Sequence, residues 1–100
     1  ESTDWLMANG LSDVRHALAG ATPYLRQFGV VAGGWMMVRS ALAAAGLQAG
    51  DGGGFDDAFL AAKHTTARFY CTQILPTARG LVGAVTAGFE DLMALEPTQF

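Results

Sequence analysis

Apolar residues recur at intervals of three or four along residues 14–45, and this spacing constrains the fold more than any other feature of the chain. The positions are Val14, Leu18, Ala21, Leu25, Phe28, Ala32, Trp35, Val38, Leu42 and Ala45. Because an α-helix turns once every ~3.6 residues, the spacing places these side chains on one helix face. Ser12 or Asp13 is suited to cap the start, and Gly46 to end the helix. The sequence therefore predicts a helix over residues 13–45.

Pro23 interrupts this helix and leaves two interpretations. Thr22 is a suitable N-cap for a new helix with Pro23 in its first turn. Alternatively the helix continues with a kink, at the loss of the hydrogen bond from residue 23 to the Ala19 carbonyl. The apolar face keeps its phase across the proline, which a loop would not require, so we favour the kinked continuous helix.

A glycine-rich loop separates this helix from a second one. Gly50, Asp51, Gly52, Gly53 and Gly54 break any helix because glycine has the highest backbone entropy to lose. A second face follows over residues 55–94, again at helical spacing, and Pro76 either breaks or kinks it. Its positions are Leu60, His64, Ala67, Cys71, Ile74, Ala78, Leu81, Val85 and Leu92, flanked by Phe55, Phe59, Ala62, Thr66 and Phe69. A short helix over residues 3–9 precedes both.

These elements predict a single all-α domain over residues 1–100. We expect an antiparallel up-and-down bundle built on two long kinked helices, because a short glycine-rich loop lets them share apolar faces. At 1.5 Å per residue the first helix would extend roughly 50 Å, against a radius of gyration near 13 Å for a compact domain of this size. The hairpin should therefore need cover from more protein.

Composition limits the classes of partner. Hydrophobic residues make up 51% of the chain and charged residues 15%, against about 25% charged in typical soluble domains. The net charge of -3 and the scattered cations exclude a nucleic-acid footprint. The longest uncharged apolar stretch, residues 28–38, lies between Arg26 and Arg39 and is shorter than the ~20 residues that cross a bilayer, so no membrane span is expected.

The single cysteine and the first residues bear on location and origin. Cys71 has no partner for an internal disulfide, which favours a cytoplasmic protein. The chain begins with Glu1 rather than Met and has no basic or apolar leader. We expect it to be part of a longer polypeptide, although processing of a small precursor would give the same start.

No pattern of residues supports catalysis or metal binding. His16 and His64 lack nearby ligands at metal-binding spacing, and Cys71 has no adjacent cation to lower its pKa. The glycine-rich loop lacks the Lys-Ser or Lys-Thr of a phosphate-binding loop. We therefore predict no catalytic, cofactor-binding or metal-binding residue in this chain.

Small residues four apart suggest where two helices come close. Gly29, Gly33 and Gly34 share one helix, and Gly80, Ala84 and Gly88 the other, a pattern that allows close approach of backbones. They serve either packing within the hairpin or assembly with another chain, and packing within the hairpin is the simpler interpretation.

Several spaced motifs resemble the C-terminal domain of the long acyl-CoA dehydrogenases, which include the enzymes acting on methylmercaptopropionyl-CoA. The most specific is Lys63-His64-Thr65-Thr66-Ala67-Arg68-Phe69-Tyr70, followed by Ile74-Leu75-Pro76, with Pro23-Tyr24-Leu25, Phe28-Gly29-Val30 and Gly34-Trp35 upstream. The resemblance covers residues 5–95.

The resemblance implies a parent oxidoreductase that uses FAD to desaturate an acyl-CoA, in fatty acid metabolism. It places the catalytic glutamate and flavin site in a dehydrogenase core that this chain lacks, so the chain alone is not expected to be an enzyme. The implied partners are that core and neighbouring subunits of a homo-oligomer, with Lys63, Arg68, Tyr70, Gly29 and Gly33 as docking candidates. The alternative is a free-standing helical dimerisation module, paired through its glycine-lined faces and unrelated to flavin chemistry.

Overall fold

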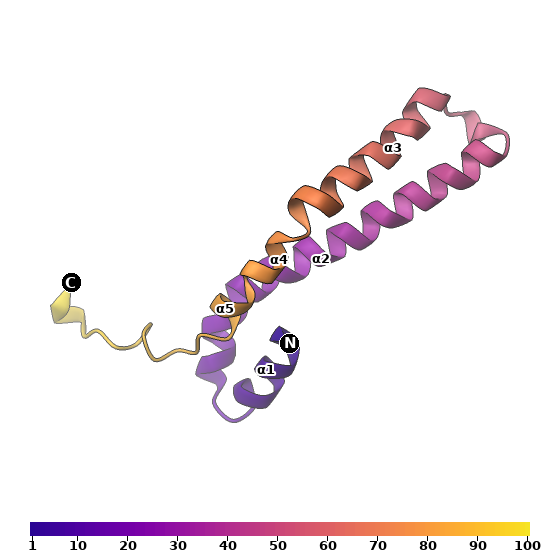
Figure 1. Ribbon diagram of the computed structural model, residues 1–100. Coiled ribbons are helices and arrows are strands. Elements are labelled where there is room, and N and C mark those ends of the chain that lie inside the picture. Colours follow the sequence, from indigo (N-terminus) through magenta and orange to yellow (C-terminus); the bar gives the residue numbers. More distant parts are fainter. The chain divides into compact units, whose positions relative to one another are not determined.

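The computed structural model describes residues 1–100 and contains helices and turns but no β-strand (Figure 1). Helix α1 spans Ser2–Gly10, α2 spans Val14–Ala49 and α3 spans Asp57–Phe69. A π-helical turn at Tyr70–Ile74 leads to two short helices, α4 at Thr77–Gly80 and α5 at Val82–Val85. A 3-10 turn at Pro97–Gln99 lies near the end. The predicted all-α class is confirmed.

The chain forms two compact units, and α2 contributes to both. Gly29–Thr77 make up the first, which we call the hairpin unit. Glu1–Phe28 and Ala78–Phe100 make up the second, which we call the terminal unit. The two units are described separately below.

Helix α2 runs through Pro23 without interruption, as we expected from the phase of its apolar residues. Asp13 caps its start, because its carboxylate accepts a hydrogen bond of 3.0 Å from the backbone N–H of Arg15. The predicted end at Gly46 is wrong, since the helix continues to Ala49. Gly46 is not among the glycines with positive φ, and the first of these, Gly52, lies in the loop beyond the helix.

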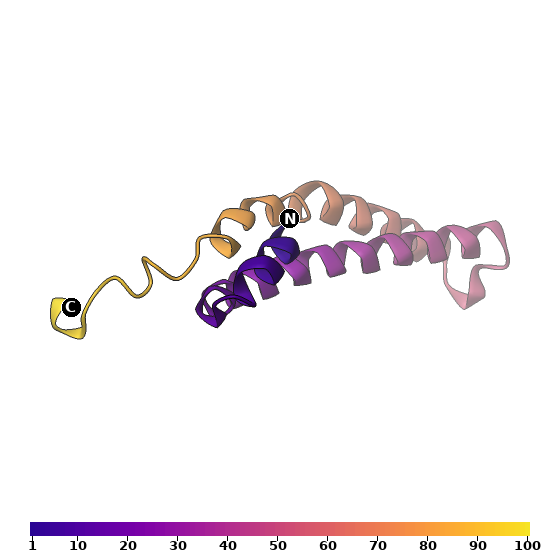
Figure 2. The same ribbon diagram turned by 90° about the horizontal axis from the view of Figure 1, so that it is seen from below.

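Within the hairpin unit, the loop reverses the chain and α3 runs antiparallel to α2 (Figures 1 and 2). Gly52, Gly53 and Gly54 all have positive φ, a conformation that favours glycine, so the sequence encodes this turn directly. Gln48 near the turn bonds His64 at 3.0 Å, and Val30 far from it bonds Tyr70 at 2.9 Å. The sequence separation therefore grows away from the turn, as in an antiparallel pair.

The single helix predicted over residues 55–94 is wrong. Its first part, α3, ends at Phe69, and the Leu75 N–H bonds the Tyr70 carbonyl five residues back at 2.9 Å. Pro76 then breaks the helix because it has no N–H to donate. Helical structure resumes in α4 and α5 and stops at Val85, before Gly88 with φ +83. The residues from 86 to 94 form turns and bends rather than helix.

The face predicted for the second helix packs as expected. Leu60 and Ala67 are buried in the hairpin unit, and Ala78 and Val85 in the terminal unit. All four belong to the predicted row of apolar positions. Leu60 and Val85 are the largest fully buried side chains in the chain, so each unit has one such aliphatic residue in its core.

The face predicted for α2 is wrong, because its large side chains lie on the outside. They form what we call the outer stripe, and their exposed fractions run from 44% to 73%. The stripe comprises Val14, Leu18, Leu25, Phe28, Trp35, Val38 and Leu42. The buried positions of α2 are Gly20, Gly34 and Ala44. Small residues allow the backbones to approach closely, so each unit packs on the small face and leaves the large one uncovered.

Candidate docking surface

The outer stripe is an apolar feature that the structure leaves without cover in each unit: Val14, Leu18, Leu25 and Phe28 belong to the terminal unit, and Trp35, Val38 and Leu42 to the hairpin unit. A single exposed Leu or Val is ordinary, but a contiguous row of large side chains indicates an interaction surface. Helix α2 is also long and apolar enough to cross a membrane, judged by length and composition alone. The stripe therefore suits cover by an apolar surface, and its chemistry does not select between protein and lipid.

Two of the docking candidates, Tyr70 and Gly33, contact each other inside the hairpin unit. The Tyr70 hydroxyl donates a hydrogen bond of 2.9 Å to the Val30 carbonyl. A Cβ atom at position 33 would overlap the phenol oxygen of Tyr70 and lie 2.9 Å from its Cζ. Gly33 therefore makes room for this ring, and both residues hold α2 and the end of α3 together.

Arg68 lies on the wall of an open groove between α2 and α3. The groove has a volume of about 320 Å³, and Val38, Ala41, Leu42, Ala45, His64, Ala67, Arg68 and Cys71 line it. Arg68 is exposed and takes part in none of the chain's ion pairs. His64 bonds Gln48 at 3.0 Å, and Cys71 is half-buried. Arg68 is thus a free cation on an apolar groove, which we call the Arg68 groove.

Lys63 and Gly29 lie elsewhere in the hairpin unit. The Lys63 ammonium sits 4.6 Å from the centre of the Phe59 ring and borders a smaller groove of about 130 Å³ beside Ala44. Gly29 is exposed, and a Cβ there would meet nothing within 4 Å. Of the five candidates, Tyr70 and Gly33 therefore contact each other within the unit. Lys63 and Arg68 are cations at two different grooves, and Gly29 lies at an open surface position.

The glycine-lined faces serve the chain's own packing. Gly34 faces Leu75, whose Cδ1 would lie 3.0 Å from a Cβ at that position. Gly20 faces the Val85 carbonyl in the terminal unit, at 2.7 Å from such a Cβ. At Gly80, by contrast, a Cβ would meet open space. Gly20, Gly33 and Gly34 are therefore occupied within single units, which removes them as the interface of a free-standing dimer.

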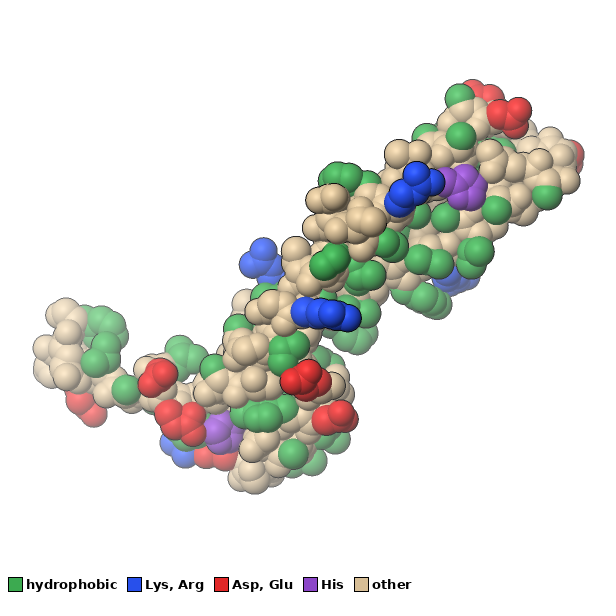
Figure 3. Space-filling model, viewed as in Figure 1, with side chains coloured by type: hydrophobic (Ala, Val, Ile, Leu, Met, Phe, Trp, Pro, Cys, Tyr) green, Lys and Arg blue, Asp and Glu red, His purple; other side chains and the backbone are tan.

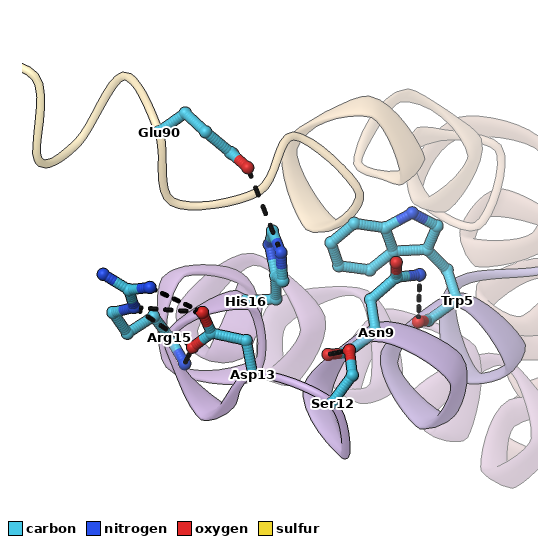
Figure 4. A network of polar contacts seen from close by, with 7 residues as sticks. All are labelled: Trp5, Asn9, Ser12, Asp13, Arg15, His16 and Glu90. Carbon is cyan, nitrogen blue, oxygen red and sulfur yellow. Dashed lines mark hydrogen bonds and ion pairs between the residues drawn. The ribbon is translucent and has the colours of Figure 1, made fainter.

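A cluster around His16 holds the segment after α5 in the terminal unit (Figure 4). The imidazole is half-buried, with its ring centre 5.6 Å from Trp5 and 4.8 Å from Phe89. Its Nε2 lies 3.9 Å from the Glu90 carboxylate, and the Arg15 guanidinium lies 4.0 Å from the centre of the Phe89 ring. Phe89 is thus held between two side chains of α2.

Asp13 forms the one well-defined ion pair of this cluster. Its carboxylate accepts three hydrogen bonds of 2.7 to 3.1 Å from the Arg15 guanidinium. These bonds, with the one from the Arg15 backbone, lower the pKa of Asp13 from 3.8 to about 2. The side-chain bonds are the largest cause. Because Arg15 also covers Phe89, the ion pair orients the guanidinium over that ring.

The comparison with known families decides the identity of the chain. The family described as acetyl-CoA dehydrogenase C-terminal like matches residues 1–96. The chain belongs to this family. No curated protein and no solved structure matches the chain. The resemblance carried by residues 63–70 and their companions is thereby confirmed as far as a C-terminal domain of the acyl-CoA dehydrogenase kind.

Neither the Arg68 groove nor the pocket beside Phe89 fits a flavin. A flavin dinucleotide needs hydrogen-bond donors for its pyrophosphate and its ring system, whereas the cavities are lined almost entirely by apolar side chains. In the pocket of about 340 Å³ beside Phe89, the only polar side chain is Arg15, which already binds Asp13. The Arg68 groove offers polar groups only at His64 and Arg68. We therefore assign no step of a flavin reaction to this chain.

The sequence analysis missed two parts of this acyl-CoA dehydrogenase C-terminal domain. One is the uncovered stripe, since periodicity locates an apolar face without indicating what covers it. The other is the His16 cluster, whose partners Trp5 and Phe89 are far from it in sequence. The only sequence signals for this cluster are the aromatic side chains of Trp5 and Phe89 and the glycine before Phe89, and they do not indicate that both rings contact His16.

The depressed pKa of Asp13 predicts a pH-dependent stability. A carboxyl pKa that is lower in the folded state stabilises the fold at pH values above the ordinary pKa of 3.8. This contribution is lost as the pH falls from 3.8 through about 2. Asp13→Asn retains a capping oxygen but not the charge. We expect the variant to melt below the wild type at neutral pH and the difference to vanish near pH 2, measured by circular dichroism. Asp57→Asn, which changes an exposed carboxylate that takes part in no ion pair, is the control. A difference that is constant with pH would contradict the ion-pair account.

Proposed function

We propose that this chain is the helical C-terminal domain of an FAD-dependent acyl-CoA dehydrogenase and serves to pack that enzyme's subunits. On this proposal the dehydrogenase core, which precedes the domain in the same cytoplasmic polypeptide, binds FAD and the acyl-CoA. The domain has no catalytic group of its own. The resemblance of residues 63–70 favours a parent of the methylmercaptopropionyl-CoA dehydrogenase type.

The outer stripe is the observation that carries the assembly role. Leu25 is 73% exposed and Phe28 62% exposed, although both are large apolar side chains on one face of α2 in the terminal unit. At about 25 cal/mol per Å² of apolar surface removed from water, covering several such side chains stabilises an assembly by several kcal/mol. On this proposal the cover is the dehydrogenase core of the same polypeptide or of a neighbouring subunit.

The test is made in the intact polypeptide, with polar replacements in the stripe. Leu25→Gln with Phe28→Gln is expected to reduce the mass of the oligomer and its melting temperature, while the flavin absorption of the core persists. Met7→Gln with Leu11→Gln changes two residues that are 58% and 79% exposed outside the stripe, and is the matched control.

Two results would reject the proposal. One is an intact polypeptide without a flavin-binding dehydrogenase core, which would remove the assigned parent. The other is a stripe variant whose oligomer mass and melting temperature match those of the control, which would remove the assembly role. Dye reduction with acyl-CoA substrates, including methylmercaptopropionyl-CoA, tests the assigned reaction separately.

A further inference from the structure

The segment after α5 has the sequence pattern of an amphipathic helix but does not form one in a single chain. The sequence predicted helix to residue 94 because Leu92 continues the apolar row of the second helix, and Phe89, Leu92 and Met93 are themselves at helical spacing. In the structure, residues 86–95 are turns and bends. Short helices are marginal in water and gain most of their stability from packing an apolar face. The missing helix therefore indicates a missing partner surface.

This segment, residues 86–100, combines exposed apolar side chains with negative charge. Leu92 and Met93 are 69% and 68% exposed, and Leu95 is 53% exposed. Glu90, Asp91 and Glu96 are its only charged residues, so it contains carboxylates and no cation. We call it the acidic segment. Its acids appear in red among apolar residues at one end of the chain in Figure 3.

The Arg68 groove has the complementary properties. Its walls are apolar, and Leu42 on its edge is 68% exposed. In the helical stretches 29–50 and 58–77 the charged residues are Arg39, Lys63 and Arg68, all cations. The carboxylates of the hairpin unit, Asp51, Asp56 and Asp57, lie at its turn. Figure 3 shows a basic side chain beside a histidine among apolar ones over α2 and α3.

We propose that the acidic segment of a second copy of this chain docks in the Arg68 groove as a helix. Leu92 and Met93 would enter between Val38 and Leu42 on one wall and Ala67 on the other, while Asp91, at the edge of that apolar face, meets Arg68. Binding of an amphipathic helix in an apolar groove is a common mode of recognition, and opposite charges fix its register.

A second copy fits because every chain carries both halves of the contact. The acidic segment of one chain can therefore meet the groove of another copy without any third partner. The three arginines of α2, by contrast, disfavour direct pairing of one α2 with another, since that helix contains no carboxylate to balance them. The inference specifies the partner in the proposed assembly role and rests on that role.

Charge reversal tests the exchange, with the mass of the full 100-residue chain measured by sedimentation. Arg68→Glu, and separately Asp91→Arg with Glu96→Arg, should each weaken dimerisation by at least about tenfold, because like charges then meet. Combining all three substitutions in one chain should restore it. Arg26→Glu, and Glu1→Arg with Asp4→Arg, change the net charge equally at other sites and should leave the dimer intact.

The decisive experiment mixes the Arg68→Glu variant with the variant that carries Asp91→Arg and Glu96→Arg. Each alone should remain near the 10.5 kDa monomer, whereas the mixture should form dimers because each groove then finds a segment of opposite charge. The far-UV helical signal should rise with dimer formation as the segment folds. Leu42→Gln should weaken the dimer, and Leu11→Gln, at a leucine that is 79% exposed outside the groove, should not.

Three outcomes would overturn the exchange. A wild-type chain that stays monomeric at high concentration rejects it, and so does a dimer indifferent to Arg68→Glu. A monomer that binds neutral phosphatidylcholine vesicles through α2 would instead favour the lipid bilayer as the cover. None of these results depends on flavin or on Leu25 and Phe28, so failure here is distinct from failure of the dehydrogenase assignment.

Discussion

Replacing Leu60 by alanine is expected to lower the free energy of unfolding of the hairpin unit by about 3 kcal/mol. Leu60 is 1% exposed and packs where α3 crosses Ala44, which is 3% exposed. Truncation of a buried leucine loses its transfer free energy and leaves a cavity, and such changes cost ~2 to 5 kcal/mol. The residues of α2 on its small face are too short to fill the cavity left by the substitution, so we expect little relaxation of the structure around it.

Urea denaturation followed by circular dichroism measures this loss as a lower midpoint. Met36→Ala is the matched control, because Met36 is a large apolar side chain of the same unit that is 52% exposed and lies outside the outer stripe and the Arg68 groove. The control should lower the free energy of unfolding by less than about 0.5 kcal/mol, as for most surface substitutions. Equal shifts in the two variants would contradict the assignment of the small face as the packed one.

The second large effect concerns Gly20, where α2 meets the Val85 carbonyl in the terminal unit. A methyl group at Gly20 would lie 2.7 Å from that carbonyl oxygen and 3.3 Å from Leu6 Cδ2. Overpacking of this kind costs ~1 to 3 kcal/mol, which outweighs the ~1 kcal/mol that alanine gains over glycine inside a helix. Gly20→Ala should therefore destabilise the terminal unit.

Gly46→Ala makes the same change in the same helix at an open position and is expected to stabilise. No atom lies within 4 Å of a Cβ built there, so only the helix propensity changes. The two variants should shift the unfolding midpoint in opposite directions. Hydrogen exchange of the amides in α1 and α5 would locate the loss in Gly20→Ala. Two shifts of the same sign would refute the close approach at Gly20.

The sequence predicted the packing of the second helix better than that of the first. Leu60 and Val85 belong to the predicted apolar row and are buried, so periodicity located that face. The flanking Phe55, Phe59 and Phe69 nevertheless stay 43% to 58% exposed. On α2 two apolar faces compete, one of large residues and one of Gly20, Gly34 and Ala44. Periodicity weighted by hydrophobicity selects the large residues, whereas close helix contact selects the small ones.

The other misassignments have local causes. Gly46 was expected to end α2, but a glycine followed by leucine, glutamine and alanine continues the helix and leaves termination to the glycine-rich loop. The helix predicted to residue 94 was encoded in the spacing of apolar residues, yet spacing does not supply a packing partner. The sequence predicts Tyr70 and Gly33 as docking residues, because it does not distinguish a contact within the hairpin unit from a contact with another protein surface.

The terminal unit is discontinuous in sequence, and this has a consequence for the order of folding. Its two parts, residues 1–28 and 78–100, are separated by the whole hairpin unit. During synthesis the terminal unit cannot form until Val85 has been made. Bringing its two parts together costs less conformational entropy if the residues between them have already folded back at the glycine-rich turn. The hairpin unit should therefore form first, and Leu60→Ala should slow the later docking of α5, whereas Gly20→Ala should leave formation of the hairpin unchanged.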